Sequence, residues 1–170
     1  MSITDRNNIL TLIESAEREA AELILHAHGI LAETKSGRRD VVTEYDRRVQ
    51  ELLIQRLSEA LPGAHFFCEE LDERDRLDAE QLFIIDPIDG TMNFVHGFHH
   101  SCISVAYAER GEVLAGAIYN PYMDELFTAV KRRGSISEWQ TDPRDGRGAC
   151  RQRGLLRHGA LQSGAHGPDI

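Results

Sequence analysis

The sequence predicts an α+β fold in which a helix pair packs on an antiparallel sheet and an irregular tail follows. Apolar residues at helical spacing come first, and alternating strand-like segments joined by short turns come after them. Charge separates the tail: residues 1–130 hold 11 basic and 24 acidic side chains, a net of −13, whereas residues 131–170 hold 8 and 4, a net of +4. We therefore expect one structural part over residues 1–134 and a separate tail over residues 135–170.

The first helix is predicted from Thr4 or Asp5, either of which can cap it, to about Gly29. Its charged residues are expected to cover the faces away from the core, as in an amphipathic surface helix. The predicted apolar stripe holds Ile9, Leu12, Ile13, Ala16, Ala20, Leu23 and Ala27, and the charged faces hold Glu14, Glu17, Arg18, Glu19 and Glu22.

The second helix is predicted to begin after Thr43, whose hydroxyl can cap it. Asp46, three residues later, supplies the partner of a capping box. The dipeptide Pro62-Gly63 ends the helix, because proline cannot continue it. Its predicted buried stripe holds Val49, Leu52, Leu53, Leu57 and Leu61.

Strands are predicted for the rest of the body. Residues 82–85 are four consecutive apolar side chains, which is typical of a strand buried on both faces, and this strand is expected to end at Asp86. Cys102 lies in an alternating segment and is expected to be a small core residue. The other predicted strands are a short one at 65–68 and a meander of three at 101–109, 113–119 and 125–130.

Composition excludes several classes of protein. No apolar run approaches the roughly 18 residues of a membrane span, and no basic stretch followed by an apolar run marks a signal peptide. Cys68, Cys102 and Cys150 are irregularly spaced, which fits reduced thiols rather than a disulfide framework or a zinc cluster. We expect a cytoplasmic protein with no membrane partner and no nucleic acid partner.

Residues 86–94 carry the most chemical information. The buried strand delivers Asp86 to its carboxyl end, where α/β proteins place ligands, and Asp89 adds a second carboxylate. Gly90 and Thr91 then offer backbone N–H groups and a hydroxyl suited to a phosphate oxygen at a helix start. The pattern indicates a magnesium site, since Mg²⁺ takes oxygen ligands and shares the phosphates of its substrates.

Other interpretations of these residues are less favoured. A solvated acidic turn would explain two aspartates alone, but not the proline, threonine and buried strand around them. A haloacid-dehalogenase site is rejected because it needs one residue between its aspartates, and two intervene here. The nearby His96, His99 and His100 are more typical of a substrate loop or a surface than of a metal cluster, because Mg²⁺ prefers oxygen.

The motifs resemble those of the inositol monophosphatase family, the Mg²⁺-dependent, lithium-sensitive sugar phosphatases. The resemblance covers roughly residues 5–134 and implies the N-terminal part of the layered αβαβα sugar-phosphatase fold. In that fold, residues 1–134 would form the metal-binding part of the domain. The matching segments, in the family's order and spacing, are Lys35, residues 42–46, Glu69-Glu70, and residues 86–94, 95–97, 120–121 and 125–127.

The resemblance implies a two-metal site. Glu69 and Asp86, together with the backbone carbonyl of Ile88, would hold the first Mg²⁺. Asp86 would bridge to a second Mg²⁺, which Asp89 also binds. Two metals about 4 Å apart can position a water in line and stabilise the leaving oxygen, so no side-chain nucleophile is needed.

The resemblance also implies the catalytic residues. Thr91, paired with Asp46, would orient the attacking water, and Glu70 would assist. The backbone of Gly90 and Thr91 would hold the phosphate, with Lys35 near that site. The catalytic set is thus Asp46, Glu70 and Thr91, and the substrate-binding set is Lys35, Ile88, Gly90 and Thr91.

The implied activity is hydrolysis of inositol monophosphate or a related sugar phosphate by metal-activated water. The partner would be this small phosphorylated substrate, and the resemblance allows for a homodimer. Histidinol phosphate and 3'-phosphoadenosine 5'-phosphate are the alternative substrates. A different alternative is a truncated, catalytically inactive fragment that at most binds Mg²⁺ or a protein partner.

The family's pattern stops after Lys131, and a shifted reading frame can account for it. The codons GAA TGG CAG ACG GAT CCG CGC encode residues 138–144, and shifted by one base they read Asn-Gly-Arg-Arg-Ile-Arg, which begins with the family's next motif. We expect residues from about Ser137 onward to be out-of-frame translation; an intact frame at the gene locus would refute this. The alternatives are a nucleic-acid-binding arm, which lacks interleaved aromatics, and a natural disordered terminus.

Overall fold

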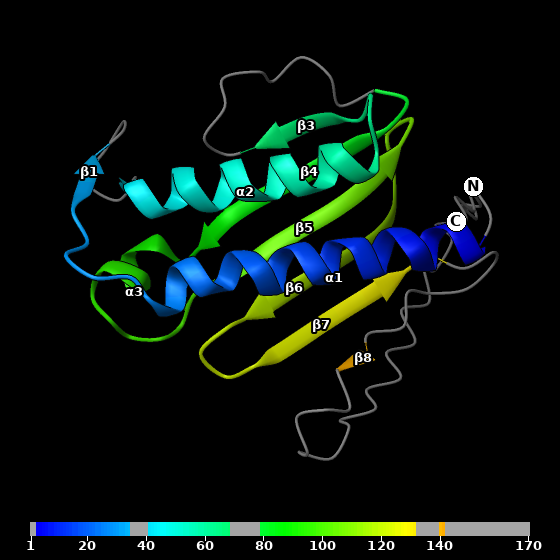
Figure 1. Cartoon of the computed structure of the whole chain (residues 1–170). Coiled ribbons are helices and arrows are strands. Elements are labelled where there is room, and N and C mark those ends of the chain that lie inside the picture. Colours follow the sequence, from blue (N-terminus) through cyan, green and yellow to red (C-terminus); the bar gives the residue numbers. More distant parts are fainter. Residues whose placement is uncertain (1–2, 35–40, 69–78, 132–139, 142–170) are drawn as a thin grey trace, which may run out of the picture.

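The computed structural model describes residues 3–34, 41–68, 79–131 and 140–141. Two long helices lie side by side on one face of a six-stranded sheet, and a separate two-stranded sheet lies at one end of the molecule (Figure 1). The elements are α1 (Ile3–Leu25), β1 (Ala32–Thr34), β2 (Val41–Thr43), α2 (Glu44–Ala60), β3 (His65–Cys68), β4 (Leu82–Asp89), α3 (Thr91–Val95), β5 (Cys102–Glu109), β6 (Glu112–Asn120), β7 (Glu125–Val130) and β8 (Gln140–Thr141).

The α+β fold class is confirmed, but the sheet is mixed rather than purely antiparallel. Strand order is β3-β4-β5-β6-β7-β8, and every neighbouring pair from β4 to β8 is antiparallel. The β3–β4 pair is parallel, so the sheet is mixed. The chain between these two strands, residues 69–81, is long enough for the crossover that a parallel pair needs. Of the predicted tail, the structure describes only β8, which pairs with β7.

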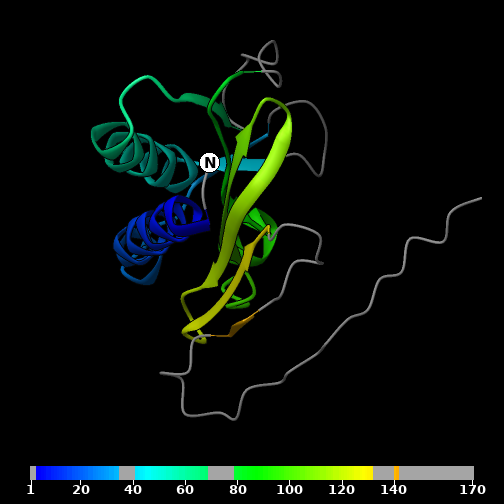
Figure 2. The same ribbon diagram turned by 90° about the vertical axis from the view of Figure 1, so that its right-hand side faces the viewer.

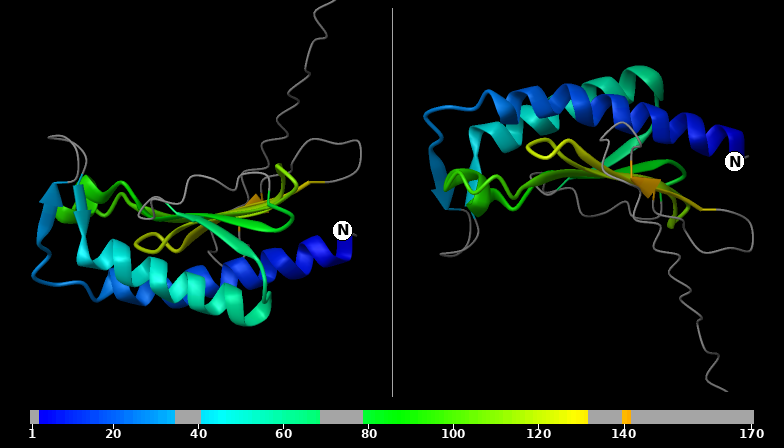
Figure 3. Two further views of the ribbon diagram at one scale, coloured as in Figure 1. Left: turned by 90° about the horizontal axis from the view of Figure 1, so that it is seen from above. Right: turned by 90° about the horizontal axis from the view of Figure 1, so that it is seen from below.

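Both long helices cover the same face of the sheet (Figures 2 and 3). Helix α1 packs mainly on β6 and β5, and α2 packs on β4 and α1. The core between helices and sheet includes Ile13 of α1, Leu53 of α2 and Phe83 of β4, all fully buried. Because the helices leave the other face of the sheet uncovered, Ile84 of β4 is only half-buried. The prediction that this strand is buried on both faces is therefore wrong at Ile84.

One predicted surface residue of α1 is buried. Glu17 was expected on the charged face, but its side chain is 0% exposed. It follows Ala16 directly and lies four residues after Ile13 and three before Ala20, so helical geometry puts it inside the stripe that faces the sheet. Burial raises the pKa of the Glu17 carboxyl well above its usual value, because the charged form loses its hydration.

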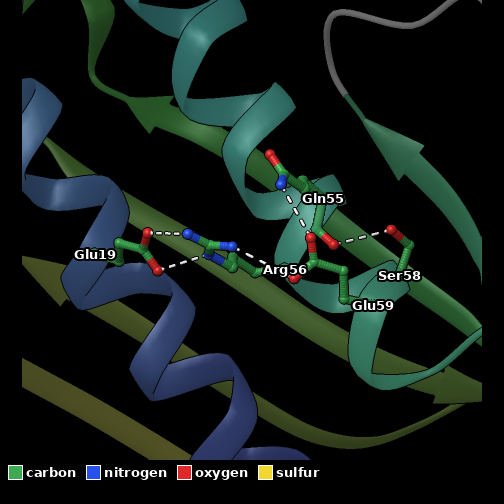
Figure 4. Close-up of polar contacts among 5 residues, drawn as sticks. All are labelled: Glu19, Gln55, Arg56, Ser58 and Glu59. Carbon is green, nitrogen blue, oxygen red and sulfur yellow. Dashed lines mark hydrogen bonds and ion pairs between the residues drawn. The ribbon is translucent and has the colours of Figure 1, made fainter.

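An arginine clamp ties the two helices together at their solvent side (Figure 4). Arg56 of α2 donates from Nε and Nη2 to the two carboxylate oxygens of Glu19 of α1, at 2.8 and 2.6 Å. A further contact of 3.4 Å joins Arg56 to Glu59. The forked geometry fixes the orientation of α1 against α2, although both charged side chains stay partly exposed to water.

Neither long helix in the described part of the chain combines the length and the apolar character needed to cross a membrane.

Candidate active site

The predicted capping box of α2 is present and holds Asp46 rigidly. The Thr43 hydroxyl accepts from the backbone N–H of Asp46 at 3.4 Å and of Tyr45 at 3.2 Å. In return, Asp46 Oδ2 accepts from the Thr43 backbone N–H at 2.7 Å and from the Thr43 hydroxyl at 2.6 Å. Asp46 is only 2% exposed. Its carboxylate is thus fixed at the start of the helix, with Oδ1 directed elsewhere.

Thr91, at the start of α3, contacts this carboxylate from a distant part of the chain. Its hydroxyl Oγ1 lies 3.2 Å from Asp46 Oδ1 and 3.0 Å from the backbone carbonyl of Ile88, and it can donate to either. A hydroxyl carries a single proton, so its oxygen lone pairs remain able to accept from a third group. The structure thereby brings together Asp46, Thr91 and Ile88, which the sequence had placed in one site.

An irregularity in β4 sets the two aspartates on one face of the sheet. Asp86 pairs with Ser104 of β5, and Asp89 pairs with Cys102, with a register shift between the two pairs. Asp86 and Asp89 are three residues apart, so in a regular strand their side chains would lie on opposite faces of the sheet. Their partners Ser104 and Cys102 are two residues apart and lie on the same face. The register shift, which leaves β4 with one more residue than β5 between these pairs, therefore places the Asp89 side chain on the same sheet face as Asp86, away from the helices.

Gly90 connects β4 to α3 in a conformation that needs glycine. Its φ is +88°, in the left-handed region. A Cβ at this position would lie 2.9 Å from the backbone oxygen of His100, so another side chain would collide with main chain as well as strain the turn. The same His100 oxygen accepts from Asn93 Nδ2 at 2.8 Å. The turn that carries Gly90 and Thr91 is thus tied to the loop leading into β5.

Cys102 lies in the site rather than in the core, so the prediction of a core residue is wrong. Its side chain is half-buried, and Sγ is 3.8 Å from Asp89 Oδ2. On β5 the side chains of Ile103 and Val105 face the core, and alternation puts Cys102 on the other face. Burial first, and then the negative charges of Asp89 and Asp86, raise the pKa of the Cys102 thiol to about 12.

Three predicted site residues, Lys35, Glu69 and Glu70, lie outside the described residues. Within the part of the chain that is described, no three acidic, histidine or cysteine side chains gather closely enough to hold a metal ion by themselves. The donors present nevertheless fit Mg²⁺, because carboxylates and a backbone carbonyl are the oxygen ligands it takes.

The histidines that follow α3 lie at the surface. His96, His99 and His100 are all exposed. The first two contact aromatic rings instead: His96 lies 5.8 Å from Phe98, and His99 stacks on Tyr122 at 4.5 Å between ring centres.

Sequence reasoning missed two residues of the site. Thr43 was predicted only as a helix cap, but it also fixes the carboxylate of Asp46. A signal existed, since the same capping box that starts a helix also immobilises its acidic partner. Cys102 was missed because alternation alone does not tell which face of a strand is buried.

Comparison with known proteins identifies the family. Residues 5–152 match the sequence pattern described as "Inositol monophosphatase family". The chain belongs to the inositol monophosphatase family. The inositol-1-monophosphatase of Mesorhizobium japonicum is 39% identical over 100 residues, which cover 59% of this chain and 38% of that protein. The match runs past residue 134 and so does not test the predicted boundary between body and tail.

Solved structures of family members share this architecture. The Thermotoga maritima inositol monophosphatase superposes with a TM-score of 0.67 at 34% identity, covering 79% of this chain and 51% of that one. An IMPase/NADP phosphatase, solved with Mg²⁺ and phosphate, gives a TM-score of 0.65 at 26% identity and covers 81% and 52%. The chain therefore spans about half the length of the solved structures it matches.

Proposed function

We propose that this chain supplies the N-terminal metal site of a Mg²⁺-dependent phosphomonoesterase that hydrolyses inositol monophosphate or a related sugar phosphate. The observation that carries the proposal is the hydrogen bond between Thr91 and Asp46, made across 45 residues of sequence and beside two aspartates on one sheet face. Family membership supports the same reaction class. The Mg²⁺ and phosphate named for the related IMPase/NADP phosphatase support the choice of metal and of substrate group.

Asp86 and Asp89 are the residues of the described chain that would hold Mg²⁺ through their side chains, with the Ile88 carbonyl and Glu69 completing the set. When bound, Mg²⁺ supplies neutralisation of the phosphate oxygens and a lowered pKa for a bound water. The Ile88 carbonyl can serve although Thr91 lies within hydrogen-bond reach of it, because a carbonyl oxygen has two lone pairs.

Thr91, paired with Asp46, would accept a hydrogen bond from the attacking water and orient it. Thr91 Oγ1 can donate to Asp46 Oδ1 and still accept a hydrogen bond from water. Asp46 cannot turn away, because Thr43 holds its other oxygen with two short bonds. When Thr91 donates to Asp46, its hydroxyl oxygen can accept from the water and so orient it, as general-base catalysis requires. Glu70 would assist from outside the described residues.

The phosphate would lie against the turn at the start of α3. The backbone N–H groups of Gly90 and Thr91 are candidates for its oxygens, because a tight turn at a helix start presents main-chain donors to an anion. Glycine at position 90 is what permits this turn, because a Cβ there would collide with the backbone oxygen of His100. Lys35 would add a positive charge near the same group.

A second candidate is a chain that binds Mg²⁺ without turnover. The observation that favours it is length: the chain spans 38% of the Mesorhizobium relative and about half of the solved structures. Residues contributed by the rest of such relatives would then be needed for hydrolysis. The two candidates share the metal site and differ only in activity.

A phosphate-release assay separates the candidates. The full chain is incubated with inositol 1-phosphate and Mg²⁺, with and without Li⁺, beside the variants Asp89→Asn and Glu80→Gln. Asp89→Asn removes a predicted metal ligand, whereas Glu80→Gln makes the same change at an exposed position outside the site. Activity that Li⁺ and Asp89→Asn abolish, and that Glu80→Gln preserves, supports the enzyme. A folded chain without turnover that still binds Mg²⁺ supports the second candidate.

A further inference from the structure

Cys102 is placed directly opposite a predicted metal ligand. It begins β5 and pairs with Asp89 of β4, immediately after the register shift that brings Asp89 to the face of Asp86. Its sulfur lies 3.8 Å from Asp89 Oδ2, within the range of a hydrogen bond from a thiol. Because an ionised carboxylate can only accept, the thiol is the donor in this contact.

We propose that Cys102 is a positioning residue for the metal site: its thiol holds Asp89 Oδ2 and would leave Oδ1 available to bind the cation. The inference rests on the proposed function, in which Asp89 binds Mg²⁺. Asp89 is exposed at the end of β4, so its side chain would otherwise rotate freely in water. A carboxylate held by an outer donor loses less rotational freedom when it binds a metal.

The packing around Cys102 argues that the thiol is not needed for the core. Ile103 and Val105 fill the core side of β5, and by alternation Cys102 lies on the opposite face of the strand. The backbone pairing with Asp89 holds for any residue at this position. What the side chain adds is the donor beside Asp89.

The test compares Cys102→Val, which keeps similar bulk without a donor, with Cys102→Ser, which restores a donor. Binding of Mn²⁺ to the full chain is titrated by electron paramagnetic resonance, since Mn²⁺ takes the same oxygen ligands as Mg²⁺. We expect about tenfold weaker Mn²⁺ binding for Cys102→Val, as for the loss of other outer partners of metal ligands, and near wild-type binding for Cys102→Ser. Thermal midpoints of both variants check that the fold is intact.

The outcomes separate this inference from the proposed function. If the wild-type chain binds Mn²⁺ and folded Cys102→Val binds it equally well, the positioning role is overturned while the metal site stands. Equal weakening by Cys102→Val and Cys102→Ser also overturns it, because the donor is then irrelevant. If the wild-type chain binds no Mn²⁺ at all, the proposed metal site itself falls, and the inference falls with it.

Discussion

Asp46 and Glu17 are both buried carboxyl groups on helices that pack on the same sheet, yet their surroundings are opposite. Asp46 has three donors within hydrogen-bond distance, two from Thr43 and one from Thr91. Neither oxygen of Glu17 meets a donor in hydrogen-bond geometry among the described residues. Burial raises the pKa of Glu17, and the neighbouring backbone of Val105 opposes this only in part. Burial alone therefore does not mark a functional acid; its partners do.

The energetic consequences of the two environments also differ. A buried polar group with partners recovers much of what it loses on leaving water, whereas a buried group without them does not. Asp46 therefore contributes to helix α2 and to the site together. Glu17 is a cost to the stability of the α1–sheet interface, because burial disfavours the charged form of its carboxyl and raises its pKa.

The largest expected effect is on phosphate release and comes from removing the negative charge of Asp46. Asp46→Asn replaces the carboxylate that three donors now meet with an amide, so the Thr91 hydroxyl loses its charged acceptor. If the chain has the proposed phosphatase activity, we expect phosphate release to fall by about 100-fold or more, since a positioned proton acceptor contributes about 10²–10⁴-fold. The control is Glu44→Gln, an exposed change in the same first turn of α2. A similar loss in both variants would show that the lost negative charge in the first turn of α2, not the Thr91 contact, is responsible.

A smaller effect is expected from replacing Glu17, and this substitution should stabilise the fold. Glu17→Met keeps an unbranched side chain of similar size and removes the buried carboxyl. We expect the free energy of unfolding to rise by about 1–3 kcal/mol at pH 7, the cost of an unpartnered polar group. Chemical denaturation followed by circular dichroism measures it.

The raised pKa of Glu17 also predicts how the free energy of unfolding changes with pH. The folded pKa of Glu17 is raised above the unfolded value near 4.5, so the folded chain keeps a proton that the unfolded chain releases. Stability is therefore full below that value and declines as the pH rises toward the folded pKa. In Glu17→Met this part of the slope should vanish. A wild-type and a variant curve that run parallel from pH 5 to 8 would contradict the assignment.

The smallest effect is expected at the clamp between α1 and α2. Arg56→Met removes both contacts to Glu19 but keeps the apolar stem that covers the helix surface. Because both charged groups are partly exposed, the thermal midpoint should fall only slightly, and by less at 1 M salt than at low salt. A loss as large as the Glu17→Met gain would mean that the clamp is better shielded from water than its exposure indicates.

Much of this fold follows from local sequence patterns. The capping box at Thr43 and the strands at 65–68 and 125–130 form where the sequence predicts them, because each is bounded by turn or cap residues. The β1–β2 pair was not predicted, since each strand has only three residues and too little alternation to detect.

The failures inside the site have a different cause. The turn of Asp89 to the face of Asp86 depends on the register of β5, which no local pattern contains. Glu17 was misplaced because its charge outweighed its position between Ile13 and Ala20 in the stripe. The roles of Lys35 and of Glu69-Glu70 stay predictions, because these residues lie outside the described chain.

The double use of Thr43 makes folding of α2 and assembly of the site one cooperative event. The Thr43 hydroxyl caps the first turn of α2 and also holds Asp46 Oδ2. This second contact leaves Asp46 Oδ1 directed toward Thr91. Fraying of the first turn of α2 would therefore disable the site before the rest of the helix melts. Exchange of the Tyr45 and Asp46 amide protons with solvent should accordingly report how often the site is assembled, whether or not substrate is present.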